Sequence, residues 1–294
     1  MSSISLKLGY KYLRSNRGGT FSFTTLLAII GLSIGISSLI VVTSVMNGFE
    51  KELEDRILGV IPHSVITSVE PIDNYENLII NVKKNSDVLE ASAYINIEGI
   101  ISSAYETKGV SIIGVDPSKE KYLSIIPEYM LIGGLDDLNK DNSIIIGSLL
   151  AAQIGAYVGD EINITTADIK TTLIGSFPRS VNLEIVGIYE LKTEIDQYLT
   201  LISHSTAQKI KNLNSFQTTG IRIKTNNLFS ADLITQNALN DINDNNLTYT
   251  SWKKTHGTLF EAIKFEKLLI SLMLFLIVAV ASILVLSTVV MTVK

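Results

Sequence analysis

Two long uncharged stretches enclose one long stretch in which polar and apolar residues are interleaved. Residues 18–49 and residues 268–293 contain no charged side chain. Each run exceeds the roughly 20 residues that a helix needs to cross a ~30 Å hydrocarbon core. The second run holds 17 residues of the Leu, Ile, Val and Phe class, each worth roughly −0.3 to −0.6 kcal/mol on insertion. We therefore expect transmembrane helices at residues 21–47 and 267–293.

Between the two runs, the hydrophobic pattern predicts short helices and short strands in irregular order. Apolar residues at helical spacing predict a helical stalk over 48–62, and a second stalk is expected over 252–267. Strands are expected at 64–69, 93–104, 109–115, 158–164, 183–189, 198–203, 220–225 and 247–249, and helices at 74–86, 118–126, 147–155, 205–213 and 228–240. This order lacks the regular alternation of a doubly wound sheet, so it predicts an α+β domain. With its stalks, the domain covers residues 48–266.

The distribution of charge predicts how the chain is oriented. The N-terminal residues 1–20 carry Lys7, Lys11, Arg14 and Arg17, and no acidic residue precedes Glu50. Short basic flanks stay in the cytoplasm, so we expect a cytoplasmic N-terminus and an external domain. All 29 acidic residues lie within residues 50–266, where 18 basic residues leave a net charge of −11.

A cleaved signal peptide is the alternative interpretation of the first run. The long basic leader, the length of the apolar run and the lack of a small-x-small cleavage site after Ser44 favour a retained anchor.

The chain carries no recognisable catalytic motif. It has no cysteine, which excludes disulfides, thiolate metal sites and thiol nucleophiles. No Walker loop, G-x-S-x-G or H-E-x-x-H motif is present. The histidines His63, His204 and His256 lack metal-ligand spacing, and carboxylates such as Asp136 and Asp137 are distributed as on a solvated surface. We expect no catalytic site, no metal and no cofactor.

Two local features are candidates for contacts with other chains. Gly31 and Gly35 lie four residues apart within the first run, a spacing that lets another helix approach closely in lipid; the alternative is that they have no special role. Residues 166–182 lie between two expected strands and are too long for a tight hairpin. They present Leu173, Ile174, Phe177, Pro178 and Arg179, so a projecting apolar loop that docks a protein is one interpretation and an ordinary long hairpin is the other.

Several sequence motifs together resemble one known family. They are KYLRSNR at 11–17, VVTSVMNGFEKEL at 41–53, RILG at 56–59 with Pro62-His63, FPR at 177–179, VGIY at 186–189, and LFEAI at 259–263 with Glu266-Lys267. The set resembles the LolC/LolE family, the membrane subunits of the lipoprotein-releasing ABC transporter within the MacB/FtsX-like superfamily. The resemblance runs from about residue 6 to the end of the chain.

This resemblance implies a fold, a location and partners. The fold is a MacB-like periplasmic core domain inserted between two transmembrane helices with helical stalks, in the bacterial inner membrane. The activity is that of a permease subunit that extracts lipoproteins and hands them to the periplasmic chaperone LolA. A separate LolD-like cytoplasmic ATPase supplies the work, and a second LolC/LolE-type subunit, identical or different, completes the membrane part. Lipoprotein substrate and membrane lipids are expected ligands, and no nucleic acid is expected.

The resemblance also implies that further segments follow in the family. Its members have four spans, with a cytoplasmic loop that contacts the ATPase after the second span. The chain therefore resembles the N-terminal portion of such a subunit.

Roles for particular residues follow from the same resemblance. The loop carrying Leu173, Ile174, Phe177, Pro178 and Arg179 is expected to dock the chaperone. An acyl-chain path is expected at the outer ends of the two spans, with lipid-facing or core packing as the alternative; its residues are Met46, Phe49, Leu53, Leu268, Leu269 and Leu272.

Two other functions remain open at this point. One is a MacB-like or FtsX-like subunit that transmits mechanical work for a different cargo. The other is a two-span sensory receptor with an external ligand-binding domain. A receptor requires a signalling module after the second span, whereas a transporter requires two further hydrophobic runs.

Overall fold

The computed structural model describes residues 23–103, 106–172, 175–242, 244 and 246–293. The chain divides into two compact units. One comprises the residues up to Lys51 together with those from Leu259 onward, and the other comprises Glu52–Thr258. Each unit has its own organisation.

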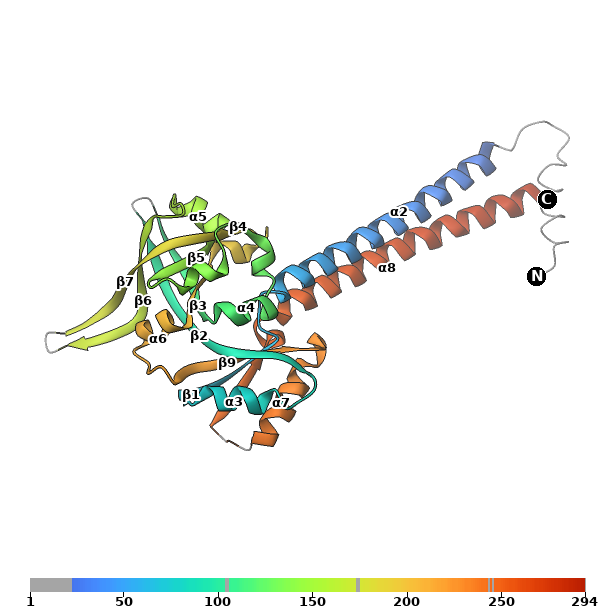
Figure 1. The fold of residues 1–294 in the computed structure, drawn as a ribbon. Helices are drawn as coiled ribbons and strands as arrows, with labels where there is room; N and C mark the ends of the chain where they lie inside the picture. The colour runs from blue at the N-terminus through green and yellow to red at the C-terminus, as the bar shows by residue number, and fades with distance from the viewer. Residues whose placement is uncertain (1–22, 104–105, 173–174, 243, 245, 294) are drawn as a thin grey trace. The chain divides into compact units, whose positions relative to one another are not determined.

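The first unit is formed by two long helices that lie side by side (Figure 1). Helix α2 spans Phe23–Leu53 and helix α8 spans Trp252–Val293. Lys267 Nζ of α8 donates to Glu50 Oε2 of α2 at 2.7 Å. Two helical segments, Ile29–Leu58 and Trp252–Ser287, are long and apolar enough to cross a membrane by length and composition. The boundaries 21–47 and 267–293 for the spans stay predictions.

The second unit contains ten strands and a set of short helices among the described residues. The strands are β1 (Ser64–Asp73), β2 (Val88–Ser102), β3 (Thr107–Val115), β4 (Met130–Ile132), β5 (Ser143–Gly147), β6 (Glu161–Thr172), β7 (Gly175–Tyr189), β8 (Leu199–Ser203), β9 (Gln217–Thr225) and β10 (Leu247–Ser251). The α-helices are α3 (Tyr75–Val82), α4 (Pro117–Leu123), α5 (Ser148–Ile154), α6 (His204–Lys211) and α7 (Ala231–Ile242). The tighter or wider helical turns are η1 (Glu54–Leu58), η2 (Ile126–Tyr129), η3 (Leu135–Asn139), η4 (Glu194–Gln197) and η5 (Leu228–Ser230).

Six of these strands close into a barrel. The pairing runs from β2 to β3, β8, β5, β7 and β6, and β6 pairs back to β2 through Gly99–Ser102. The β3–β8 and β5–β7 pairs are parallel, and the other four are antiparallel. Closure removes the exposed sheet edges that would otherwise invite pairing with other chains. The short strand β4 adds to the outside of β7.

The barrel is filled by branched aliphatic side chains that alternate along each strand. They belong to one buried cluster that includes Ile95, Ile97, Ile101, Val110, Ile112, Ile144, Ile146, Ile162, Ile164, Leu183, Ile185 and Ile202. Helices α5 and α6 supply further members, among them Leu150 and Ala207. Gly114 of β3 lies so close to Ala207 that a Cβ there would overlap it, and the missing side chain therefore lets α6 approach the strand.

The long strand β2 also belongs to a second, four-stranded sheet. Its N-terminal half, Val88–Tyr94, pairs with β9, and the antiparallel order is β10-β1-β9-β2. Helices α3 and α7 lie against this sheet in Figure 1, and their Ile79, Val82, Ile234 and Ala238 share a buried cluster with Ile66, Ile221 and Ile223 of the strands. The mixture of barrel, sheet and helices confirms the expected α+β class.

Most predicted elements are present in the part of the chain that the structure describes. Gly155 ends α5 with a positive φ of 64°, as the glycine after residues 147–154 indicated. Residues 166–182, for which a projecting loop and an ordinary long hairpin were the two interpretations, belong to the hairpin of β6 and β7, whose strands pair as far as Thr172 and Gly175. Strand β5, a fully buried strand whose apolar run is only three isoleucines long, was not predicted.

Candidate functional site

The β6–β7 hairpin extends beyond the barrel as an arm, defined here as residues 167–178. Strand β2 pairs with β6 only from Asn163 to Thr166, and the β6–β7 register shifts between Thr166 and Ile169. Beyond that irregularity the described residues of the two strands pair only with each other, and Figure 1 shows them projecting away from the barrel. The fold therefore carries the described residues of the arm outside the strand pairing of the barrel.

The base of the arm is held by polar contacts on both strands. Asn163 Nδ2 donates to Asn182 Oδ1 at 2.7 Å, and the hydroxyls of Thr165 and Ser180 lie 2.9 Å apart. The guanidinium of Arg179 donates to the carbonyl of Ile210 in the last turn of α6. Because a helix end leaves carbonyls without intrahelical partners, this cation both satisfies an acceptor and fixes the arm to α6.

The expected docking residues are distributed along this hairpin. The backbones of Phe177 and Pro178 lie in β7, opposite Lys170 and Ile169. Leu173 and Ile174, at the turn, lie outside the described residues. Arg179 lies at the base, where it contacts α6. The assignment of these five residues to docking stays a prediction.

The expected acyl-path residues occur on both long helices. On α2, Phe49 is exposed while Met46 and Leu53 are half-buried; on α8, Leu268, Leu269 and Leu272 are all exposed. The ion pair between Glu50 and Lys267 lies directly beside Phe49 and Leu268 in the sequence. Its carboxylate and ammonium are the charges that end the two uncharged runs, so the runs end at matching levels on the two helices.

Gly31 and Gly35 lie on α2 with open space around them. No atom lies within 4 Å of where a Cβ would stand on either residue, apart from the helix itself and chain neighbours. A role for them in packing against another helix stays a prediction.

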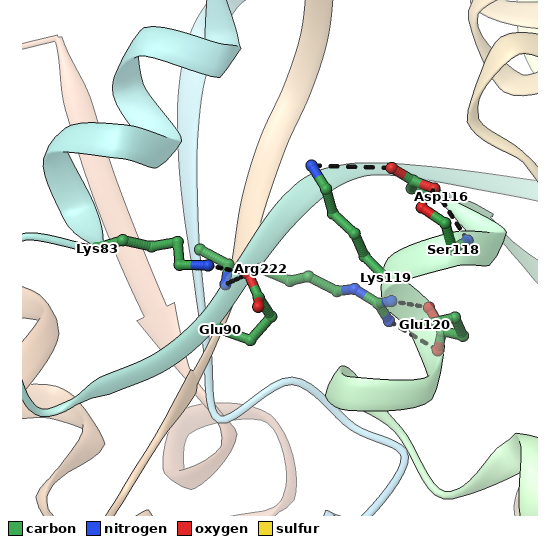
Figure 2. Close-up of polar contacts among 8 residues, drawn as sticks. Lys83, Glu90, Asp116, Ser118, Lys119, Glu120 and Arg222 are labelled. Atoms are coloured by element: carbon green, nitrogen blue, oxygen red, sulfur yellow. Dashed lines mark hydrogen bonds and ion pairs between the residues drawn. The ribbon is translucent and has the colours of Figure 1, made fainter.

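A buried ion pair joins α4 to the four-stranded sheet. Arg222 of β9 and Glu120 of α4 are almost fully buried, and Arg222 Nη1 donates to Glu120 Oε1 at 3.2 Å while Nη2 contacts Oε2 (Figure 2). Burial lowers the pKa of the Arg222 guanidinium to about 10. Nearby, Lys83, which directly follows α3, and Glu90 of β2 form a partly exposed pair at 2.7 Å. Nothing in the sequence signals the Arg222–Glu120 pair, because its partners are 102 positions apart.

The histidines of the second unit are held as neutral hydrogen-bonding groups. The backbone N–H of Thr225 donates to His63 Nδ1 at 3.1 Å, and burial, with the nearby Lys224 charge, lowers the pKa of His63 to about 4. His204 stacks edge-on against Tyr75, and burial lowers its pKa to about 4. Within the described ranges, no group of three or more His, Asp or Glu side chains is placed to hold a metal ion.

Comparison with known protein families gives one match that covers most of the chain. Residues 25–237 match the MacB-like periplasmic core domain. Lipoprotein-releasing system transmembrane protein LolC of Neisseria meningitidis serogroup B is 31% identical, over 100% of this chain and 71% of that protein. Lipoprotein-releasing system transmembrane protein LolE of Haemophilus influenzae is 27% identical, over 90% of this chain and 65% of that protein.

Solved structures with a similar arrangement are more distant. The periplasmic region of MacB from Actinobacillus actinomycetemcomitans is 12% identical with a TM-score of 0.44, covering 71% of this chain and 97% of that one. The extracellular domain of the ABC-type transporter YknZ from Gram-positive bacteria is 9% identical with a TM-score of 0.42, covering 65% and 100%.

Proposed function

The chain belongs to the LolC/LolE family and carries a MacB-like periplasmic core domain, and from this membership we propose that it is a permease subunit of an ABC transporter that releases lipoproteins from the bacterial inner membrane. The observation that carries the proposal is the 31% identity to a lipoprotein-releasing transmembrane protein along the whole chain. The two long apolar helices and the domain between them are the parts that such a subunit needs.

Physical chemistry explains why such a system needs separate parts. Each CH₂ group of a buried acyl chain contributes about 0.8 kcal/mol, so a triacylated lipoprotein is held in the bilayer by tens of kcal/mol. No domain without an energy source offsets that. We propose that a LolD-like cytoplasmic ATPase supplies the work, and that a second LolC/LolE-type subunit pairs with this one. The helices α2 and α8 then transmit the work, with the N-terminus in the cytoplasm and Glu52–Thr258 in the periplasm.

The arm at residues 167–178 is our proposed docking element for the periplasmic chaperone LolA. Its support is geometric: the hairpin projects from the barrel while its base is fixed to α6 through Arg179. Phe177, Pro178, Leu173 and Ile174 supply the apolar surface in this proposal. A photocrosslinker at position 177 is expected to capture LolA, and one at the exposed Tyr157, outside the arm, is the matched control. Equal capture from both positions would contradict this assignment.

We place the acyl path at the outer ends of the two helices. Phe49, Leu268 and Leu272 are exposed apolar side chains, and the first two adjoin Glu50 and Lys267 in the sequence. An apolar chain drawn out of the bilayer meets these residues before it meets the charged pair.

The direct test of the proposed function is the composition of the complex that the natural gene product forms. Purified from its own membranes in mild detergent, it is expected to carry an ABC ATPase and bound lipoprotein. Recovery of the ATPase with a different cargo would instead support a MacB-like or FtsX-like subunit, and recovery of neither would contradict the proposal.

A further inference from the structure

A groove of about 570 Å³ lies on the outer surface of the barrel, inside the second unit. One wall is formed by the outward-facing side chains of β2 and β3, which alternate with the buried isoleucines of the barrel. The other wall comes from the segment before β1 and from the β10–α8 junction. The lining includes Val60, Ile61, Pro62, Val65, Tyr94, Asn96, Glu98, Val110, Ser111, Ile113, Tyr198, Trp252, Thr255 and His256.

Several polar atoms in this lining are already bonded within the protein. Ser111 Oγ donates to Asn96 Oδ1 at 2.9 Å, and Trp252 Nε1 donates to the carbonyl of Leu228 at 2.9 Å. His256 Nδ1 lies 2.9 Å from Thr255 Oγ1. A polar ligand would have to compete with these bonds, whereas a hydrocarbon ligand leaves them intact. The lining therefore favours an apolar ligand.

The charges around the groove exclude an anionic ligand. Among the described residues that line it, none is Lys or Arg, and Glu98, which is exposed, is the one carboxylate. The phenols of Tyr94 and Tyr198 are uncharged at neutral pH, and burial raises the pKa of both further. A phosphate group would meet a carboxylate and no cation. This rules against recognition of a phospholipid head group and favours a neutral chain.

The volume and position of the groove suit an aliphatic chain. Small-ligand sites occupy roughly 300–1,000 Å³ and are lined mainly by apolar and aromatic side chains. The segments that carry the second wall, residues 60–65 and 250–256, adjoin the two long apolar helices in the sequence. We infer that the groove binds one acyl chain of a lipoprotein during its transfer out of the membrane, an inference that rests on the proposed function.

Trp252 allows this binding to be measured directly, since it lines the groove and is the chain's only tryptophan. The experiment titrates the full chain in nanodiscs with 11-bromo-1-undecanol, whose bromine quenches indole fluorescence. We expect saturable quenching. Because each buried CH₂ changes affinity by about fourfold, 8-bromo-1-octanol is expected to bind roughly 50-fold more weakly. Quenching that rises linearly without saturation would overturn the inference.

A matched pair of glycine substitutions separates the groove from the surrounding lipid. Gly109 lines the groove, and a Cβ added there would have open space around it, so Gly109→Phe is chosen to place a ring in the groove. Gly134 also has open space but lies outside the groove. Gly109→Phe is expected to weaken binding at least tenfold and Gly134→Phe to leave it unchanged. Equal affinities in the two variants would overturn the inference.

Crosslinking in cells tests whether the acyl chain in the groove belongs to a lipoprotein or to a phospholipid. A benzophenone amino acid in place of Tyr198 is expected to capture lipoprotein, while the same group in place of the exposed Tyr122, which does not line the groove, is not. Capture of phospholipid alone from position 198 would overturn the inference. If the protein binds no bromoalkanol but still purifies with the ATPase and lipoprotein, the assignment of the groove is wrong and the proposed function still stands.

Discussion

Arg222 and Glu120 form an ion pair that water does not reach, at the junction between α4 and the four-stranded sheet. Removing one partner leaves the other charge buried without compensation, which costs about 3–5 kcal/mol. Replacing both by apolar residues removes that cost. We expect Glu120→Leu to lower the free energy of unfolding by about that amount and Glu120→Leu with Arg222→Met to recover most of it. Urea unfolding of the full chain, followed by Trp252 fluorescence, measures both. A double variant as unstable as the single one would contradict this account of the pair.

The titration of His63 makes the stability of the fold depend on pH. Its pKa is about 4 when folded and about 6.5 when unfolded, so the unfolded state binds more protons between these values. Stability is therefore present above pH 6.5 and is lost as the pH falls toward 4. From pH 7 to pH 5 the loss assigned to His63 is about 2 kcal/mol. The variant His63→Asn keeps an acceptor for Thr225, because its Oδ1 can accept from the same N–H. Urea unfolding of this variant is expected to show a drop in the free energy of unfolding between pH 7 and pH 5 that is smaller by that amount. A drop as large as that of the unsubstituted protein would refute the assignment to His63.

Single residues show where prediction from the sequence stops. The motifs at 41–53 and 177–179 identified the family without any structure. The Arg222–Glu120 pair and the groove are contacts between segments far apart in the chain, and each of their residues has an ordinary local context. Arg179 lies at the base of the arm, and its bond to the carbonyl of Ile210 depends on how α6 packs against β7, which the local sequence does not specify.

Among the elements, α2 and α8 share a charged contact at the end of the uncharged runs. Glu50 and Lys267 are partly shielded from solvent, so we expect their interaction to contribute about 1 kcal/mol or less. Glu50→Lys places two ammonium groups together and is expected to lower the thermal unfolding midpoint in nanodiscs. Combining it with Lys267→Glu is expected to restore the midpoint. Additive effects of the two reversals would show that the residues do not interact.

Elements were predicted best where an apolar run is long or where a residue such as glycine marks the end of the element. The uncharged runs and the glycine after α5 gave unambiguous helices. Strand β5 was not predicted because Ser143–Gly147 is short and buried on all sides, so its residues do not alternate between apolar and polar. The outer parts of β6 and β7 were not predicted as strands because residues 165–172 are mostly polar. These parts form strands by pairing with each other and not through burial in the barrel.

At the scale of the whole molecule, closure of the barrel depends on pairs that local patterns do not encode. The parallel β3–β8 pair joins Ser111 to Leu199, and the β2–β6 pair that completes the ring joins Gly99 to Thr166. The irregular order of helices and strands predicted the α+β class, but it did not predict that six strands close into a barrel.

The absence of cysteine from the chain makes its orientation testable. Tyr157 is 74% exposed, so Tyr157→Cys offers a single accessible thiol in the second unit. In cells whose outer membrane has been permeabilised, a membrane-impermeant maleimide is expected to label this thiol while the inner membrane is intact. Labelling only after the inner membrane is lysed would place the domain in the cytoplasm and reverse the proposed orientation.

The central claim is that this protein releases lipoproteins from the membrane using work done by an ATPase partner. The most direct measurement reconstitutes the natural complex in proteoliposomes with a labelled lipoprotein, adds LolA outside, and follows the label into the soluble fraction. The account predicts transfer to LolA that requires ATP and this subunit. A lipoprotein that stays in the liposomes with ATP present, or that leaves equally well without this subunit, would contradict it.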